Sequence, residues 1–159
     1  MDPLTILHTV TAFAGVAKNL YDLGTGLYGF IDDTKHVDTT VYNLAQELQT
    51  LGDTCATIEA ELKTAEQHYG AKQNISLGPL GTTDALFWKS LKHQVQACQK
   101  TAQDLEGLLK SVQQDNKNFA KQALRQISLN LKTKEFEAIR KRVHTHAASL
   151  QMSLTMLNM

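Results

Sequence analysis

The chain has 159 residues, 42% of them hydrophobic, with 16 basic and 16 acidic side chains. This length and composition predict a single domain spanning residues 1–159, large enough for a hydrophobic core. A formal net charge of zero, with no interleaving of basic and aromatic residues, argues against nucleic-acid binding. Only two prolines and long runs without helix breakers predict an all-α fold, a bundle of four to five helices with a long apolar helix at the N-terminus.

The first helix is predicted to begin at the chain terminus, because Asp2 suits the N-cap and Pro3 suits the first helical position. From Leu4 to Ala17 there is no formal charge. This run is too short to span a bilayer, which needs about 20 apolar residues, and Lys18 interrupts its extension. It is not a secretory signal peptide either, because no basic region precedes it and no cleavage site follows.

Two interpretations of this helix stay open at the level of sequence. It is either a core helix of a bundle, or a helix that is buried at rest and can be released into a membrane. Glycines motivate the second interpretation, because each costs roughly 1 kcal/mol relative to alanine inside a helix and something should offset that cost. Close approach of two helices at a glycine is one possible explanation of what offsets this cost. A break in the helix near Gly24 is another. The residues predicted to insert are Leu4, Ile6, Leu7, Val10, Phe13, Gly15, Val16, Leu20, Gly24, Gly26 and Gly29.

The next two helices are predicted from apolar residues spaced three and four apart. Aspartates and threonines between positions 32 and 40 predict a turn and a new helix, which ends at Gly70. Residues 70–82 predict a loop, and Thr82 or Thr83 caps a third helix. Apolar residues at these spacings form an apolar stripe along one face of the helix. The stripe of the second helix is Val41, Leu44, Leu48, Leu51, Cys55, Ile58, Leu62 and Ala65. That of the third is Leu86 or Phe87, then Leu91, Val95, Cys98, Ala102, Leu105, Leu109 and Val112.

The last third of the chain predicts two shorter helices. Residues 113–118 are polar and predict a turn, residues 119–131 predict a fourth helix, and a fifth begins at Thr133. The stripe of the fifth helix is Phe136, Ile139, Val143, Ala147, Leu150, Leu154 and Leu157. Because no capping signal ends it, we expect the natural chain to continue beyond Met159 as a multidomain protein.

Charge is distributed unevenly along the chain. Residues 1–68 carry three basic and ten acidic side chains, whereas residues 117–159 carry eight and two. This asymmetry either pairs one helix with another, the alternative we favour, or gives a face attracted to anionic lipid or nucleic acid. For Arg140, Lys141 and Arg142 the alternatives are a solvated face of the fifth helix and a cluster that binds phospholipid headgroups.

No sequence pattern indicates catalysis, a cofactor or a metal site. Residues 24–29 match the glycine spacing of a dinucleotide-binding loop, but a predicted helix precedes them instead of a strand. The histidines have no ligand spacing beside a carboxylate or thiol. Cys55 and Cys98 lack CxxC spacing and predict reduced core thiols in a cytosolic protein. We therefore expect a protein that is not an enzyme.

Four segments in order carry a family resemblance, and together they span nearly the whole chain. They are MDPLTI, AGVAKNLYDL, TTVYNLAQELQTL and KEFEAIRKRVHTHAASLQMSL. They resemble the N-terminal domain of fungal STAND (NLR-like) proteins of the HeLo-like family. The resemblance implies a helical bundle that stands ahead of nucleotide-binding oligomerisation modules or repeats of the same chain.

The resemblance also implies a function in regulated cell death, as in innate immunity or heterokaryon incompatibility. Residues 4–30 would be a membrane-inserting helix and residues 40–159 the bundle that masks it. Oligomerisation would release this helix, and the cytoplasmic protein would move to anionic lipids of the plasma membrane. The alternative function is a non-enzymatic protein–protein interaction (adaptor) domain whose first helix stays permanently in the core.

Overall fold

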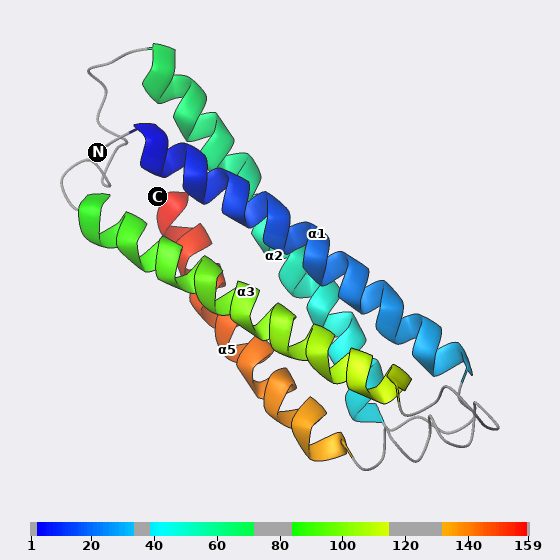
Figure 1. The fold of residues 1–159 in the computed structure, drawn as a ribbon. Helices are drawn as coiled ribbons and strands as arrows, with labels where there is room; N and C mark the ends of the chain where they lie inside the picture. The colour runs from blue at the N-terminus through cyan, green and yellow to red at the C-terminus, as the bar shows by residue number, and fades with distance from the viewer. Residues whose placement is uncertain (1–2, 34–38, 72–83, 115–131, 159) are drawn as a thin grey trace.

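The computed structural model describes residues 3–33, 39–71, 84–114 and 132–158, which form the helices in Figure 1. The helices are α1 (Pro3–Asp33), α2 (Thr39–Ala71), α3 (Asp84–Gln114) and α5 (Thr133–Leu157). No strand occurs in these ranges, which confirms the predicted all-α bundle. The helix predicted at 119–131 and nearly all of the loop predicted at 70–82 lie outside the described residues.

The helices run alternately in opposite directions and form an elongated bundle (Figure 1). α1 packs against α2 and α3, and α5 packs against the same two helices. α1 and α5 are therefore diagonal partners across the bundle, and so are α2 and α3. Each helix buries its apolar stripe toward the shared axis, as antiparallel bundles require.

The predicted apolar stripes of α2 and α3 form much of the core, with Phe87 in place of Leu86 at the start of α3. In α5, Phe136, Ile139, Val143 and Leu150 are buried, whereas Ala147, Leu154 and Leu157 are partly buried against the core. Trp88, which lies off the predicted stripe, is also buried. The core residues of α1 are Val10, Phe13, Val16, Ala17, Leu20 and Leu27.

Gly24 lies at a close approach of α1 and α2. A β-carbon added there would be 3.0 Å from Cγ of Gln49 and 3.3 Å from the carbonyl oxygen of Ala45. α1 continues through this position to Asp33, so the break that was one candidate is absent. Close helix approach is therefore the physical reason for glycine at position 24.

A second close approach of α1 and α2 occurs at Gly52, which lies on α2. A β-carbon added there would be 3.1 Å from the ring of Tyr21 on α1. The Tyr21 hydroxyl donates a hydrogen bond to the Asp53 carboxylate, which raises the pKa of Tyr21 to about 12. The ring is thus fixed over Gly52, and α1 and α2 are in close contact at two levels.

Candidate functional site

The residues predicted to insert in a membrane do not share one face of α1. Val10, Phe13, Val16, Leu20 and Gly24 are buried in the bundle. The exposed members are Leu7, Gly15, Gly26 and Gly29. The side chains of Leu4 and Ile6 lie outside what the structure describes.

The buried face of α1 contributes a large part of the core. Phe13, Val16, Leu20 and Leu27 are each 0% exposed. Burial of one such side chain stabilises the folded state by about 1.5–3 kcal/mol. The four together therefore contribute about 6–12 kcal/mol of burial free energy. A whole domain is stable by only about 5–15 kcal/mol. Release of α1 into water would therefore lose a burial contribution comparable in size to the net stability of a whole domain.

The outer face of α1 is polar. His8, Lys18 and Asp22 are exposed on it, together with exposed glycines. No atom of the described residues lies within 4 Å of a β-carbon added at Gly15 or Gly26. Close packing in the bundle therefore does not offset the helix cost of glycine at these two positions.

α1 is consequently amphipathic, with one apolar face in the core and one polar face in solvent. Within the described ranges, none of the four helices combines the length and apolar character needed to cross a membrane. The long apolar helix predicted at the N-terminus is long, at 31 residues, but its apolar character is confined to one side.

The three consecutive basic residues of α5 point to different neighbours. Nε of Arg140 lies 3.1 Å from both carboxylate oxygens of Glu47 on α2. Nη1 of Arg142 lies 2.8 Å from the carboxylate of Asp104 on α3. Lys141 is exposed. Internal pairing of charges therefore holds for two of the three residues, and they do not form a single basic face at rest.

The pairing with α3 also changes the protonation of Asp104. Its carboxylate accepts hydrogen bonds from Arg142 and from Lys100, and these cations lower its pKa below the ordinary value. Both partners are partly exposed, so water screens the pair and it contributes little to stability. It orients α5 against α3 more than it stabilises the bundle.

A second polar contact between α3 and α5 has no sequence signal. Nε2 of His146 lies 2.7 Å from Oγ1 of Thr101, which is buried. Partial burial and the nearby Arg142 lower the pKa of His146. The contact between His146 and Thr101 depends on how α5 and α3 are rotated about their own axes. The spacing of residues along a single helix does not determine that rotation.

The two cysteines meet across the bundle diagonal. Cys55 on α2 and Cys98 on α3 are free thiols, and both are 0% exposed. A hydrogen bond with Cys98, together with burial, raises the pKa of the Cys55 thiol. The prediction of core thiols is confirmed, and their reactivity is low because the thiolate is the reactive form.

Within the described ranges, no group of three histidine, cysteine or acidic side chains is arranged to hold a metal ion. Comparisons with protein families, with curated proteins and with solved structures give no match. A functional assignment therefore depends on the sequence segments, the packing of α1 and the surface of the bundle.

Proposed function

We propose that this chain is the N-terminal effector domain of a fungal NLR-like (STAND) protein of the HeLo-like family. Clustering by nucleotide-binding or repeat domains of the same chain makes α1 act on the plasma membrane and leads to regulated cell death. The position and amphipathic character of α1 support this proposal most directly. α1 packs on two of the other described helices and lies diagonal to α5, so it can leave without separating α5 from α2 and α3.

The released helix lies in the membrane interface and does not cross the bilayer at first contact. Amphipathic helices bury their apolar face about 5–10 Å into the headgroup boundary and keep the polar face in water. Val10, Phe13, Val16 and Leu20 then enter the lipid, while Lys18 stays at the surface. Apolar burial in lipid replaces burial in the core, and contacts between copies supply the remaining free energy.

Anionic headgroups bind the basic residues of α5 after activation. Lys141 is already exposed, whereas Arg140 and Arg142 first leave Glu47 and Asp104. Water screens partly exposed ion pairs of this kind, so they contribute little to stability. Their exchange for lipid phosphates is therefore inexpensive compared with the release of α1.

A second candidate function is a non-enzymatic adaptor domain in which α1 never leaves the core. The four fully buried side chains of α1 favour this function. Their release into water would lose about 6–12 kcal/mol of burial free energy. In that case a surface of the intact bundle recruits a partner protein. The two functions differ in a single measurable property, the movement of α1 away from α2.

A reversible disulfide between α1 and α2 tests this difference. In a variant carrying Gly24→Cys and Gln49→Cys, the two β-carbons lie within about 4.5 Å, because Cγ of Gln49 is 3.0 Å from a β-carbon at position 24. The oxidised variant holds α1 in place, and reduction releases it. Dye release from anionic liposomes is measured with the chain fused at its C-terminus to a trimeric coiled coil.

The membrane function predicts leakage by the clustered wild-type chain and by the reduced variant, and none by the oxidised variant. Wild-type protein under the same oxidant and reductant is the control, since its two thiols are buried. Equal leakage by the oxidised and reduced forms would show that α1 release is not required. No leakage by any clustered form would favour the adaptor function.

A further inference from the structure

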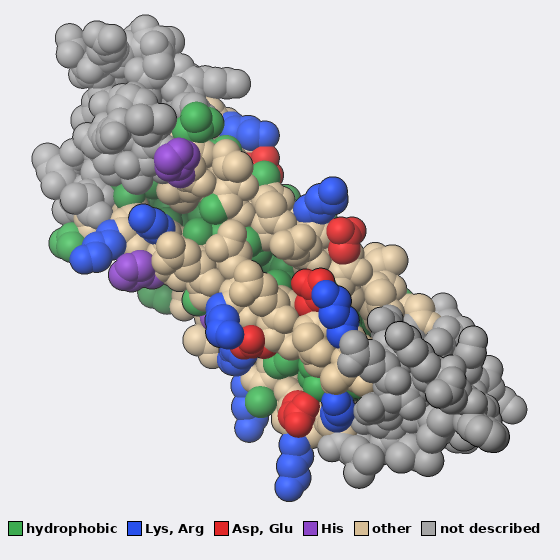
Figure 2. Space-filling view, viewed as in Figure 1, with side chains coloured by type: hydrophobic (Ala, Val, Ile, Leu, Met, Phe, Trp, Pro, Cys, Tyr) green, Lys and Arg blue, Asp and Glu red, His purple; other side chains and the backbone are tan. Residues whose placement is uncertain are grey.

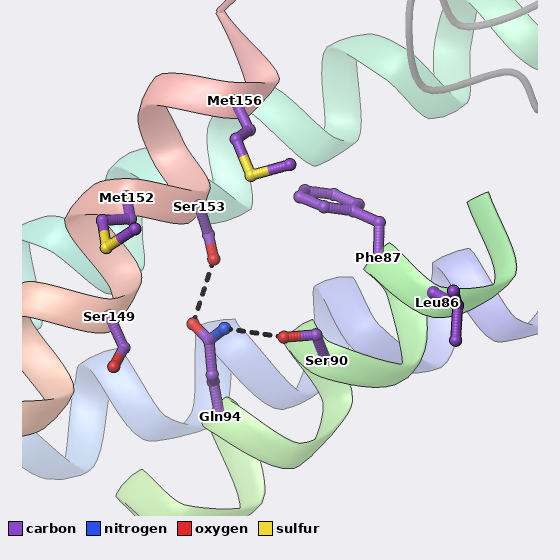
Figure 3. Close-up of a pocket in the computed structure, with 8 residues that line it drawn as sticks. All are labelled: Leu86, Phe87, Ser90, Gln94, Ser149, Met152, Ser153 and Met156. Atoms are coloured by element: carbon purple, nitrogen blue, oxygen red, sulfur yellow. Dashed lines mark hydrogen bonds between the residues drawn. The ribbon is translucent and has the colours of Figure 1, made fainter. Parts of the chain in front are cut away.

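A groove of about 550 Å³ lies between the N-terminal half of α3 and the C-terminal end of α5 (Figure 3). Three of the five large hydrophobic side chains exposed in the described ranges lie along it. Leu86 is 76% exposed, Met152 is 70% exposed and Met156 is 46% exposed. Phe87 is buried and reaches the groove beside Met156 (Figure 3). The surface therefore concentrates apolar side chains at this one place.

One hydrogen bond joins the two helices across the groove, and a second one within α3 extends it. The Ser153 hydroxyl donates to Oε1 of Gln94 at 3.1 Å, and Nε2 of Gln94 donates to the Ser90 hydroxyl at 3.0 Å (Figure 3). Ser153 is buried, and Gln94 is half-buried. Three of the four polar side chains that line the groove are thus bonded to each other, and its apolar walls remain to contact what binds.

Most charged side chains of α3 beside the groove are basic. α3 begins with Asp84, and its residues 86–103 carry three lysines and one histidine and no acidic side chain. Residues 143–157 of α5 carry neither lysine, arginine nor acidic residues. Lys89 lies three residues from Leu86 and His93 lies three from Ser90, so both are neighbours of groove residues on α3, although neither lines the groove itself. Figure 2 shows basic and histidine side chains gathered near this end of α3.

We propose that this groove binds an amphipathic helix of a partner protein, with apolar anchors on one face and acidic residues beside them. The wall from Leu86 to Gln94 covers nine residues, a rise of about 12 Å, which matches about two turns of a docked helix. The flexible side chains of Met152 and Met156 adjust to anchors of different shape. The basic rim selects acidic flanks over basic ones.

The concave form of the surface favours a protein helix over a lipid bilayer. Side chains of a helix can enter between the two walls, whereas a bilayer is contacted by groups that project from the protein. The small size of the groove favours a single helix over a second copy of the bundle, because stable dimers bury about 800 Å² on each partner. This site does not include α1, so it is independent of the proposed membrane function.

Two synthetic helical peptides test the proposal with the intact chain. Both have about 15 residues and leucines at i, i+4 and i+7, and they differ in carrying glutamates or lysines beside the leucines. Methyl NMR of Met152 and Met156 reports occupation of the groove, and fluorescence anisotropy gives the dissociation constants. We expect the glutamate peptide to shift both methyl resonances and to bind at least about tenfold more tightly than the lysine peptide.

Matched variants locate the binding site. Met152→Glu and Leu86→Glu change exposed side chains, so the bundle should fold, and each should weaken binding of the glutamate peptide at least about tenfold. Gln151→Glu adds the same charge to an exposed neighbour on α5 and is the control, with binding unchanged. Helix content measured by circular dichroism accompanies each variant.

Several results would overturn the proposal. The glutamate peptide could fail to bind, or both peptides could bind equally. Binding that leaves the Met152 and Met156 methyl resonances unchanged would also contradict it. If the methyl resonances move with protein concentration alone, a second copy occupies the groove. If they move with anionic vesicles and not with either peptide, the groove is a lipid-contact surface.

Discussion

Alanine substitution should divide the glycines of α1 into two groups with opposite effects. At Gly15 and Gly26 an added β-carbon meets no described atom within 4 Å, so alanine brings only its better helix propensity. At Gly24 the same β-carbon would be 3.0 Å from the Gln49 side chain and 3.3 Å from the Ala45 carbonyl oxygen. The backbone oxygen cannot move without α2, so the two helices must separate slightly.

The magnitudes follow from these distances. Gly15→Ala and Gly26→Ala should each raise the free energy of unfolding by about 0.5–1 kcal/mol. For a chain of this size, this corresponds to about 1–4 °C in Tm. Gly24→Ala has the same propensity gain, but overpacking costs about 1–3 kcal/mol. We therefore expect it to lower the free energy of unfolding by up to about 2.5 kcal/mol.

Urea unfolding followed by circular dichroism measures all three variants against the wild-type chain. A shift of the midpoint at unchanged slope reports a change in stability alone. The reasoning would be refuted if Gly24→Ala stabilised the bundle as much as Gly15→Ala does. That result would mean that the approach of α1 to α2 accommodates a methyl group and does not explain the glycine.

Three further predictions concern α5 and the core. Arg142→Leu should raise the pKa of Asp104, because the hydrogen bond from the guanidinium is the main cause of its low value; an NMR titration showing no rise would contradict this. The lowered pKa of His146 means that the unfolded chain binds more protons below about pH 6.5, so stability should fall as the pH drops below that value. His146→Gln should remove this part of the fall in urea midpoints, and an unchanged pH slope would rule it out. Iodoacetamide should label neither Cys55 nor Cys98 in the folded protein and both in urea, and rapid labelling without urea would disprove their burial.

The helices and much of the core were predictable because a helix has a period of 3.6 residues. The stripe beginning at Val41 and the one beginning at Phe136 follow that period, and their leading residues are buried as predicted. The choice between Leu86 and Phe87 was left open by spacing alone. Packing assigns the core position to Phe87, which leaves Leu86 exposed at the groove.

Contacts between helices were not predictable from one sequence. Arg140 and Glu47 are 93 positions apart, and their pairing depends on how α5 and α2 are rotated and placed beside each other. The same holds for the groove, where Leu86 and Met152 come together only because α3 and α5 are antiparallel neighbours. A search for regular stripes passes over Met152, which lies beside the main stripe of α5, and it does not decide whether Leu86 belongs to the stripe of α3.

If α1 leaves the bundle as proposed, the short connection between α1 and α2 limits how far it can travel. α1 ends at Asp33 and α2 begins at Thr39, so five residues join them. A helix on so short a tether stays near its own docking site at an effective concentration on the order of millimolar. It re-docks unless a membrane or a neighbouring copy competes at that concentration. The lifetime of a cluster, compared with the recapture time of the tethered helix, would therefore decide whether a release event has any consequence.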